Sequence, residues 1–322
     1  MTGSRATATP AAEIAPAELT RARIDRAGVA CLLVATLGWG LNWPIVKLLL
    51  QEWPPLFARG SAGLVAAAVF ATLAALKGER LLPARGSRWR LAWAAFTNVF
   101  AFMGFSTLAL LWLKAGEAAL LVYTMPVWAV LFAWPVLGAR PSLRSTLALV
   151  LCLAGTLILF GDSLAAFDAA KLPGVAFALA AAVLFAIGTV TGRGGVPLPP
   201  IANTAWQVGL GSAPMIVLSL AFEQPRLGAL SATGLAAWIY MTAVPMGLCY
   251  LAWFAAVRRL SPSTAATGSL LVPLIGVLAA APILGEAITP AAVAAMVLVL
   301  SGVALVVTQR ETPLSAGRPA AD

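Results

Sequence analysis

Long apolar runs separated by short polar segments make up most of this chain of 322 residues. Ten runs carry no charged residue, and each approaches or exceeds the roughly 20 residues that an α-helix needs to cross a bilayer. The runs are continuous, whereas the strands of a membrane β-barrel alternate apolar and polar positions. The pattern therefore predicts an all-α membrane protein with ten transmembrane helices. The runs cover residues 27–46, 60–76, 91–113, 118–139, 145–161, 172–192, 196–222, 227–257, 260–285 and 287–309.

The last two runs of each half of the chain repeat one another. The segment Leu260–Val306 aligns without a gap on Leu113–Leu159, 147 positions earlier, and fifteen of the 47 aligned residues are identical. Chance would give roughly one in ten in so apolar a composition. We therefore predict two five-helix repeats, residues 27–161 and 172–309. An odd number of spans reverses the chain direction, so the second repeat should be inverted. The matched backbone-shaping residues are Pro126 and Pro273, Pro135 and Pro282, Gly138 and Gly285, and Gly155 and Gly302.

Basic residues are distributed unevenly between the two predicted sides of the membrane. With ten spans, the termini and the even-numbered loops share one side, which holds sixteen of the 21 Lys and Arg residues, whereas the acidic residues divide six and six. The positive-inside rule then places both termini in the cytoplasm. Residues 1–26 should form a disordered cytoplasmic tail and residues 310–322 a second tail, in a protein of the bacterial inner membrane. This asymmetry explains the net charge of +9 without a nucleic-acid partner.

The composition excludes several classes of activity. Only 10% of the residues are charged, against about a quarter in soluble proteins. Histidine is absent, and the three cysteines, Cys31, Cys152 and Cys249, lie in separate runs without metal or disulfide spacing. The chain also lacks a glycine-rich phosphate loop. We therefore expect no enzymatic activity, no cofactor, no metal and no ATP-driven transport by this chain alone.

Tryptophans and an amide within the first run are candidates for a cavity wall. Trp39 and Trp43 are four residues apart, so they share one face of a helix. Asn42 between them places an amide at membrane depth, where it needs a partner. The same amide would also suit a hydrogen bond that only joins two helices.

Other runs add candidates through their position and spacing. Asn98, Phe102 and Phe105 recur at helical spacing in the third run, a pattern that ordinary core packing would also explain. Gly188 in the sixth run and Tyr250 in the eighth lie at a similar depth.

Two prolines lie at equivalent positions of the repeat, Pro126 in the fourth run and Pro273 in the ninth. A proline within a span leaves a backbone carbonyl without its helical partner. The same defect in both halves is typical of the moving or binding helices of a transporter, although a structural kink would also explain it.

Charged residues within the predicted spans are few. Arg59 is expected near the outer end of the second span, from which its side chain could reach the membrane surface. Lys47, Glu117 and Glu286 fall at the outer ends of spans. Because no titrating group is expected in mid-membrane, we predict transport without tight proton coupling, with Glu117 and Glu286 as candidates for weak coupling. Because no pair of basic residues is expected deep in a cavity, phosphorylated substrates are disfavoured.

These features resemble the EamA type of the drug/metabolite transporter superfamily. The motifs that carry the resemblance are Gly38–Trp43, Leu260–Ala266, Pro273, Leu284–Glu286 and Gly302. The first half matches more loosely and has Ala139 where a glutamate would be expected. The tryptophan content and the surroundings of Arg59 and Lys114 look most like the YddG-type exporters of aromatic amino acids.

The resemblance implies ten helices, arranged as two inverted five-helix repeats around a central cavity, and alternating access by rocking of helices. The first, third, fourth, sixth, eighth and ninth spans would line the cavity, and the fifth and tenth would form a supporting hairpin or contact surface. The protein would be a monomer or weak dimer in the lipid bilayer, and its partner a small-molecule substrate. The implied cavity residues are Trp39, Asn42, Trp43, Tyr123, Pro126, Ser269 and Pro273, to which position in the spans adds Asn98, Phe102, Gly188 and Tyr250.

We therefore expect a secondary transporter that exports amino acids, above all aromatic and neutral hydrophobic ones, by facilitated transport. A cavity with aromatic and aliphatic walls and a few neutral polar groups suits a molecule with an apolar body and a zwitterionic end. The main alternative is a broad-specificity exporter of metabolites or drug-like cations, which would want an acidic residue in the cavity. A scaffold, a membrane-embedded enzyme and a channel fit the duplicated prolines and the missing catalytic and pore motifs less well.

Overall fold

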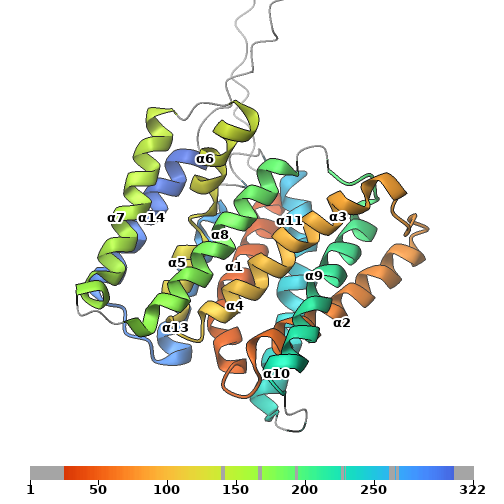
Figure 1. Cartoon of the computed structure of the whole chain (residues 1–322), viewed down its shortest axis with the longest axis horizontal. Helices are drawn as coiled ribbons and strands as arrows, with labels where there is room; N and C mark the ends of the chain where they lie inside the picture. The colour runs from red at the N-terminus through yellow and green to blue at the C-terminus, as the bar shows by residue number, and fades with distance from the viewer. Residues whose placement is uncertain are drawn as a thin grey trace, which may run out of the picture.

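The computed structural model describes residues 25–138, 142–165, 169–192, 195–225, 228, 230–260, 265 and 268–307. Within these ranges the regular structure is helical and no strand occurs (Figure 1). Seven helical stretches are long and apolar enough to cross a membrane, and three shorter apolar helices accompany them. The prediction of an all-α membrane protein is thus confirmed, whereas the count of ten spans stays a prediction. Most of both predicted tails lies outside the described residues.

Six of the predicted spans are single α-helices and the others consist of consecutive helical segments. The first, second, fifth, sixth, seventh and tenth spans correspond to α1 (Arg26–Leu49), α2 (Pro55–Leu76), α7 (Leu143–Ala165), α8 (Leu172–Thr191), α9 (Pro200–Phe222) and α14 (Pro290–Val307). The third comprises η1 (Arg85–Ser87), α3 (Arg88–Ala95), η2 (Phe96–Phe105) and α4 (Ser106–Ala109), and the fourth α5 (Ala115–Val122) and α6 (Met125–Leu137). The eighth comprises α10 (Ala232–Ala243), η4 (Val244–Leu248) and α11 (Cys249–Val257), and α13 (Leu271–Leu284) belongs to the ninth.

The start of α2 differs from the sequence prediction. The predicted run begins at Gly60 because Arg59 carries a charge, but the helix begins at Pro55. Proline is favoured at the first position of a helix, where its missing N–H has no partner to lose. Arg59 therefore lies one turn inside α2, and its charge does not mark the end of the helix.

The backbone departs from the α-helix at equivalent places in the two halves. η2 and η4 are both π-helices, and they overlap when the first is shifted by 147 positions. In the fourth span the chain turns at Tyr123 and Thr124, directly before Pro126, and in the ninth α13 begins two residues before Pro273. The two prolines thus lie in the first turn of a new helix, where their missing N–H groups cost little.

The matched glycines at the ends of α6 and α13 terminate both helices in the same way. Gly138 and Gly285 adopt left-handed conformations, with φ of 71° and 68°. Their N–H groups donate to Trp134 O at 2.8 Å and to Ala281 O at 3.0 Å. A side chain at either position would strain this conformation, so the repeated glycines are needed as C-caps.

The matched glycines Gly155 and Gly302 bring α7 and α14 into close contact. A Cβ atom on Gly155 would lie 2.9 Å from Val299 Cγ2, and one on Gly302 would lie 2.7 Å from Ala148 O. Ala148 and Cys152 of α7 are the counterparts of Ala295 and Val299 of α14, so the contact is symmetric. Because rising residue numbers in one helix meet falling numbers in the other, the two equivalent helices run antiparallel. This is the pairing that an inverted repeat predicts.

Two glutamates join α2 and α9, the second pair of equivalent helices. Glu223, just beyond α9, accepts hydrogen bonds from Leu56 N at 3.0 Å and Phe57 N at 3.1 Å in the first turn of α2. Glu79, just beyond α2, accepts one from Ala202 N at 2.9 Å in the first turn of α9. The first N–H groups of a helix lack intrahelical partners and attract negative charge. Each helix is therefore followed by a glutamate whose carboxylate caps the N-terminus of the other helix.

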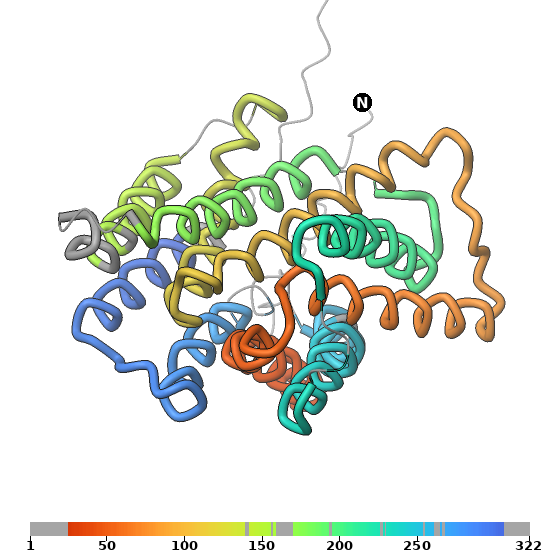
Figure 2. Tube along the Cα trace, turned by 60° about the horizontal axis from the view of Figure 1, so that its bottom comes forward, coloured from red at the N-terminus to blue at the C-terminus, as the bar shows by residue number. Residues whose placement is uncertain are grey.

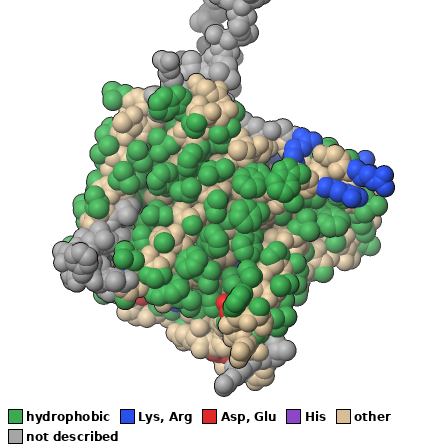
Figure 3. All heavy atoms as spheres, in the orientation of Figure 1, with side chains coloured by type: hydrophobic (Ala, Val, Ile, Leu, Met, Phe, Trp, Pro, Cys, Tyr) green, Lys and Arg blue, Asp and Glu red, His purple; other side chains and the backbone are tan. Residues whose placement is uncertain are grey.

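The packed centre of the molecule surrounds α1, and the outward faces are apolar. α1 lies between α13 and the α10–η4–α11 span (Figures 1 and 2). The main buried cluster joins Trp43 and Val46 of α1 with Leu121 and Met241 of neighbouring spans. Apolar side chains cover most of the face shown in Figure 3, and Lys and Arg side chains gather at one end of it. Such an apolar surface suits lipid.

Replacing Glu223 tests the reciprocal capping. Glu223→Ala should lower the stability by about 1–2 kcal/mol, because two N–H groups of α2 lose a charged acceptor. Thermal unfolding of the purified protein in detergent would show this as a lower melting temperature. Gln51→Ala is the matched control, since Gln51 is exposed. Equal melting temperatures for the two variants would contradict the capping role.

Candidate functional site

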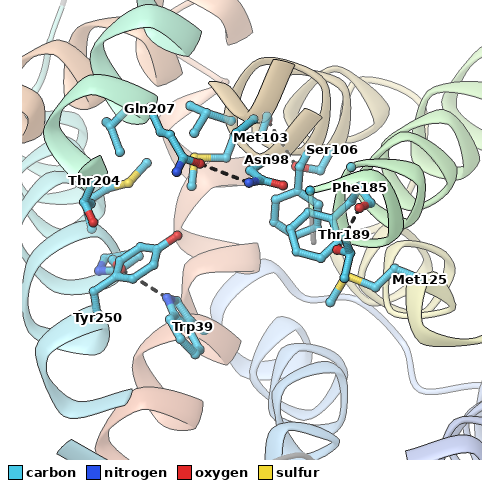
Figure 4. A pocket seen from close by; sticks show the side chains of 18 of the residues that line it. Trp39, Asn98, Met103, Ser106, Met125, Phe185, Thr189, Thr204, Gln207 and Tyr250 are labelled. Carbon is cyan, nitrogen blue, oxygen red and sulfur yellow. Dashed lines mark hydrogen bonds between the residues drawn. The ribbon is translucent and has the colours of Figure 1, made fainter. Parts of the chain in front are cut away.

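A cavity of about 640 Å³ lies within the bundle, which is within the usual range for a small-molecule site. Its wall comes from α1, α2, α3 to α4, the turn between α5 and α6, α8, α9, η4 and α11, together with Ser269. Among the residues whose side chains the structure describes, α7 and α14 contribute none to the lining. The resemblance did not place the second and seventh spans at the cavity. The second span contributes Arg59, and the seventh contributes Gln207 and Thr204, among others (Figure 4).

Nine of the eleven candidate residues line this cavity. They are Trp39, Asn42, Trp43, Asn98, Phe102, Tyr123, Gly188, Tyr250 and Ser269. Pro126 and Pro273 do not line it, and lie instead at the helix breaks beside it. Sequence reasoning missed Asn203, Thr204 and Gln207 of α9, although this polar stripe at helical spacing in an apolar run was a usable signal.

The lining residues form equivalent pairs from the two halves. Four positions of α1 recur in the sixth span 146 residues later, and four of the third span recur in the eighth 147 residues later. The pairs are Trp39 and Phe185, Asn42 and Gly188, Trp43 and Thr189, Val46 and Gly192, Asn98 and Pro245, Val99 and Met246, Met103 and Tyr250, and Ser106 and Trp253. The cavity thus lies between the two halves, and each half lines it with equivalent faces of equivalent helices.

Three aromatic residues form one wall of the cavity. The Trp39 ring lies 5.7 Å from the ring centroids of both Tyr250 and Trp253. Trp39 Nε1 donates a hydrogen bond to Pro245 O at 3.1 Å, in the π-helix η4 (Figure 4). The indole is therefore held by a polar anchor at its edge and packs beside the rings of Tyr250 and Trp253.

The π-helix η2 determines which residues of the third span face the cavity. Asn98, Phe102 and Ser106 line it, but Phe105 does not, and packs instead against Phe177 at 5.6 Å between ring centroids. A π-helix has more residues per turn than an α-helix. The α-helical spacing that grouped Phe105 with Asn98 therefore does not apply here.

A chain of amide groups crosses the cavity wall between η2 and α9. Asn98 Nδ2 donates to Gln207 Oε1 at 3.0 Å (Figure 4), and Gln207 Nε2 donates to Asn203 Oδ1 at 3.1 Å. An amide at membrane depth needs a partner, and for Asn98 another helix supplies it.

Asn42 differs from Asn98 in its bonding. Its Oδ1 atom is buried and accepts no hydrogen bond from any residue that the structure describes. An unpaired buried acceptor costs about 1–3 kcal/mol. Asn42 thus does not join two helices through this atom, and a ligand or a rearranged wall would have to supply a donor.

The expectation that Arg59 reaches the membrane surface is wrong. Its side chain is buried, with the residue 6% exposed, and it lines the cavity. Arg59 Nε donates to Thr107 Oγ1 at 3.0 Å, and the Thr107 hydroxyl donates to Met103 O at 2.7 Å. α2 packs against α9 and the third span, so the side chain at this position points inward. Arg59 is thus a single basic residue deep in the cavity wall, since the other lining arginine, Arg90, is exposed, and the expectation that no pair of basic residues lies deep in the cavity is not contradicted.

The cavity opens toward one end of the bundle. Lining residues at that end, including Arg90, Thr191 and Gly195, are exposed. Those at the other end are enclosed: Val46 is 1% and Leu110 is 3% exposed. The open end also carries the arginines around α3.

Ion pairs and hydrogen bonds hold the helices together beyond the closed end. Lys47 pairs with Glu286 at 3.4 Å, and Lys171 pairs with Glu117 at 3.0 Å. Ser231 donates its hydroxyl and its N–H to Glu52, both at 2.6 Å, and these bonds hold the pKa of the Glu52 carboxyl below its ordinary value. Glu117 and Glu286 are therefore paired outside the cavity lining.

Comparison with known proteins gives a consistent result. The profile of the EamA-like transporter family matches residues 26–161 and again residues 172–308. The chain is 33% identical to an uncharacterized protein of Pseudomonas aeruginosa over 76% of this chain and 81% of that protein. It is 27% identical to the uncharacterized transporter YvbV of Bacillus subtilis over 86% and 90% of the two chains.

Two further comparisons concern a named activity and a fold. The chain is 26% identical to the "Probable amino-acid metabolite efflux pump" of Escherichia coli, over 85% of this chain and 92% of that protein. A crystal structure with 20% sequence identity superposes with a TM-score of 0.61, over 88% of this chain and 96% of that chain. At this identity the second likeness shows the fold alone.

The two asparagines of the cavity wall offer a matched test of the site. Asn42→Leu should raise the melting temperature, because it removes a buried acceptor without a partner. Asn98→Leu should lower the melting temperature, because it leaves Gln207 Oε1 without its donor. Thermal unfolding of both variants against the unchanged protein measures the two signs. A loss of stability in Asn42→Leu as large as that in Asn98→Leu would contradict the structure.

Proposed function

Because the chain belongs to the EamA-like transporter family, we propose that it is a secondary transporter of the bacterial inner membrane that exports amino acids, with a preference for aromatic ones. The observation that carries this proposal is the wall of Trp39, Tyr250 and Trp253, which faces a cavity large enough for an amino acid. Aromatic pairs contribute about 0.5–1.5 kcal/mol beyond the burial of their area. The efflux relatives named above support amino acids as the class of substrate.

The proposed organisation is two inverted five-helix repeats, residues 27–161 and 172–309, with both termini in the cytoplasm. By the positive-inside rule the basic end of the bundle faces the cytoplasm. The cavity opens toward that same end, so an amino acid would load from the cytoplasm, as export requires.

The proposed transport cycle changes which end of the cavity is open. Helix breaks before Pro126 and Pro273 and the π-helices η2 and η4 are the places where the spans can bend with few backbone bonds lost. At the closed end, opening would require the Lys47–Glu286 and Lys171–Glu117 pairs to separate. Both pairs are partly buried, so their separation requires water to reach the charges.

We also propose that transport is facilitated and not tightly coupled to protons. Of the acidic residues whose side chains the structure describes, none lines the cavity. A proton-coupled carrier needs a titrating group on the substrate path. The same observation disfavours the alternative, a broad exporter of drug-like cations, because such a substrate would leave its charge without a carboxylate partner.

Flux through liposomes tests this function. Labelled tryptophan and phenylalanine should cross faster than alanine, saturably and with little effect of a pH gradient. Trp253→Leu should lower the flux of tryptophan about tenfold, because the loss of a ring contact of up to about 1.5 kcal/mol reduces affinity by that factor.

Trp89→Leu is the matched control, since Trp89 is 77% exposed and does not line the cavity. Flux of alanine equal to that of the aromatics would overturn the preference. A flux that follows the pH gradient would overturn the uncoupled mechanism.

A further inference from the structure

One buried cation in the cavity wall is left without a counter-charge. Arg59 has five N–H donors in its guanidinium, and Thr107 accepts only the bond from Nε. The terminal nitrogens meet no acceptor among the residues that the structure describes. Arg59 lines the cavity, so these donors are directed at whatever enters it.

All carboxylates whose side chains the structure describes have hydrogen-bond or ion-pair partners away from the cavity. None of them lines the cavity, and each has partners at the end of a helix. They are Asp25, Glu52, Glu79, Glu117, Glu223 and Glu286. A buried charge without a partner is strongly unfavourable. A site that holds such a charge fits an anion that arrives with the ligand.

The duplication of the cavity does not extend to this charge. α2 and α9 both begin with a Pro-Pro pair, Pro54–Pro55 and Pro199–Pro200, and alignment on these pairs places Thr204 opposite Arg59. Thr204 also lines the cavity but is neutral. The neutral wall is thus present twice and the buried guanidinium only once, so a ligand has one place to put an anionic group.

The position of Arg59 relative to the aromatic wall defines the shape of the ligand. Arg59 lies near the enclosed end of the cavity and within electrostatic reach of Tyr250, which belongs to that wall. An anionic group on Arg59 therefore places the remainder of a small ligand beside Trp39 and Tyr250. A carboxylate matches the two terminal nitrogens of a guanidinium, which can each donate to one of its oxygens.

We propose that Arg59 is the residue that binds the substrate carboxylate, and that the cavity selects aromatic compounds with a carboxylate over their decarboxylated or amidated analogues. Thr107 is a positioning residue, because its hydroxyl fixes the orientation of the guanidinium. This inference rests on the proposed function for the choice of aromatic substrates, but the claim that Arg59 binds a carboxylate can be tested separately.

Binding to the unchanged protein gives the first test. Indole-3-propionate and tryptophan carry a carboxylate, whereas tryptamine and tryptophanamide have the same ring without it. Dissociation constants from ligand-dependent thermal unfolding should be about 10- to 100-fold lower for the carboxylates, the range expected for hydrogen bonds to a charged group. Equal binding of all four compounds, or no binding of either carboxylate, would overturn the proposal.

Variants then assign the selectivity to Arg59. Arg59→Gln should remove the difference between indole-3-propionate and tryptamine, and Arg59→Lys should retain part of it. Thr107→Val keeps the charge and should weaken the selectivity less than Arg59→Gln. Arg88→Gln is the control, because Arg88 is exposed and does not line the cavity.

A purely structural role for Arg59 predicts a different result. Arg59→Gln would then lower the melting temperature but leave the ratio of the dissociation constants unchanged, and this would overturn the proposal. If Arg59→Gln does not fold, the ratio in the unchanged protein and in Arg59→Lys decides.

The binding ratio also separates this inference from the proposed function. Selective binding of indole-3-propionate that depends on Arg59, without flux of any amino acid, would contradict the proposed amino-acid export and support the carboxylate site. Selective flux of tryptophan, with a ratio of dissociation constants that Arg59→Gln does not change, would contradict the carboxylate site and support the proposed export.

Discussion

The absence of water from the interior of a bilayer is the constraint on which this structure depends. Backbone N–H and C=O groups must then be satisfied within the protein, and a helix satisfies them within a single span. The described spans leave the regular α-helix at the turn of Tyr123 and Thr124, at η2, at η4 and at Leu270 before α13, and each place lies at or beside residues that line the cavity. Irregular backbone is tolerated where it lines a cavity, and these are also the places where a span can bend.

Duplication followed by divergence explains how one cavity can have equivalent walls from the two halves and still hold its ligand in a single orientation. Eight pairs of lining positions repeat between the halves, and the equivalent helices α2 and α9 cap each other through Glu223 and Glu79. A strictly symmetric site would offer a zwitterion two equivalent orientations. Arg59 removes this ambiguity because its counterpart, Thr204, is neutral. The helices and the neutral part of the cavity wall are thus equivalent in the two halves, whereas the recognition of charge depends on a position at which the halves differ.

Local patterns predicted the helices, and together with the family resemblance they predicted nine of the residues that line the cavity. Apolar runs located the spans, and Trp39, Asn42 and Trp43 were placed by helical spacing. What the local patterns could not supply was the effect of neighbouring helices on a single residue. Arg59 was expected to reach the membrane surface because it lies directly before an apolar run. The packing of α9 against α2, which turns this side chain inward, could not be read from the run itself. The spacing argument that included Phe105 failed because it assumed an α-helix where a π-helix forms.

The carboxylate site proposed at Arg59 would also affect the transport cycle itself. Any change that closes the open end removes the cavity from water, and the desolvation of a lone guanidinium is costly in a medium of low dielectric. A bound carboxylate offsets that cost, because the ion pair enters the enclosed state with its charges matched. The loaded protein would therefore close faster than the empty protein, which must also close to complete a cycle of net export. On this argument the same contact that selects the substrate also speeds the conformational change.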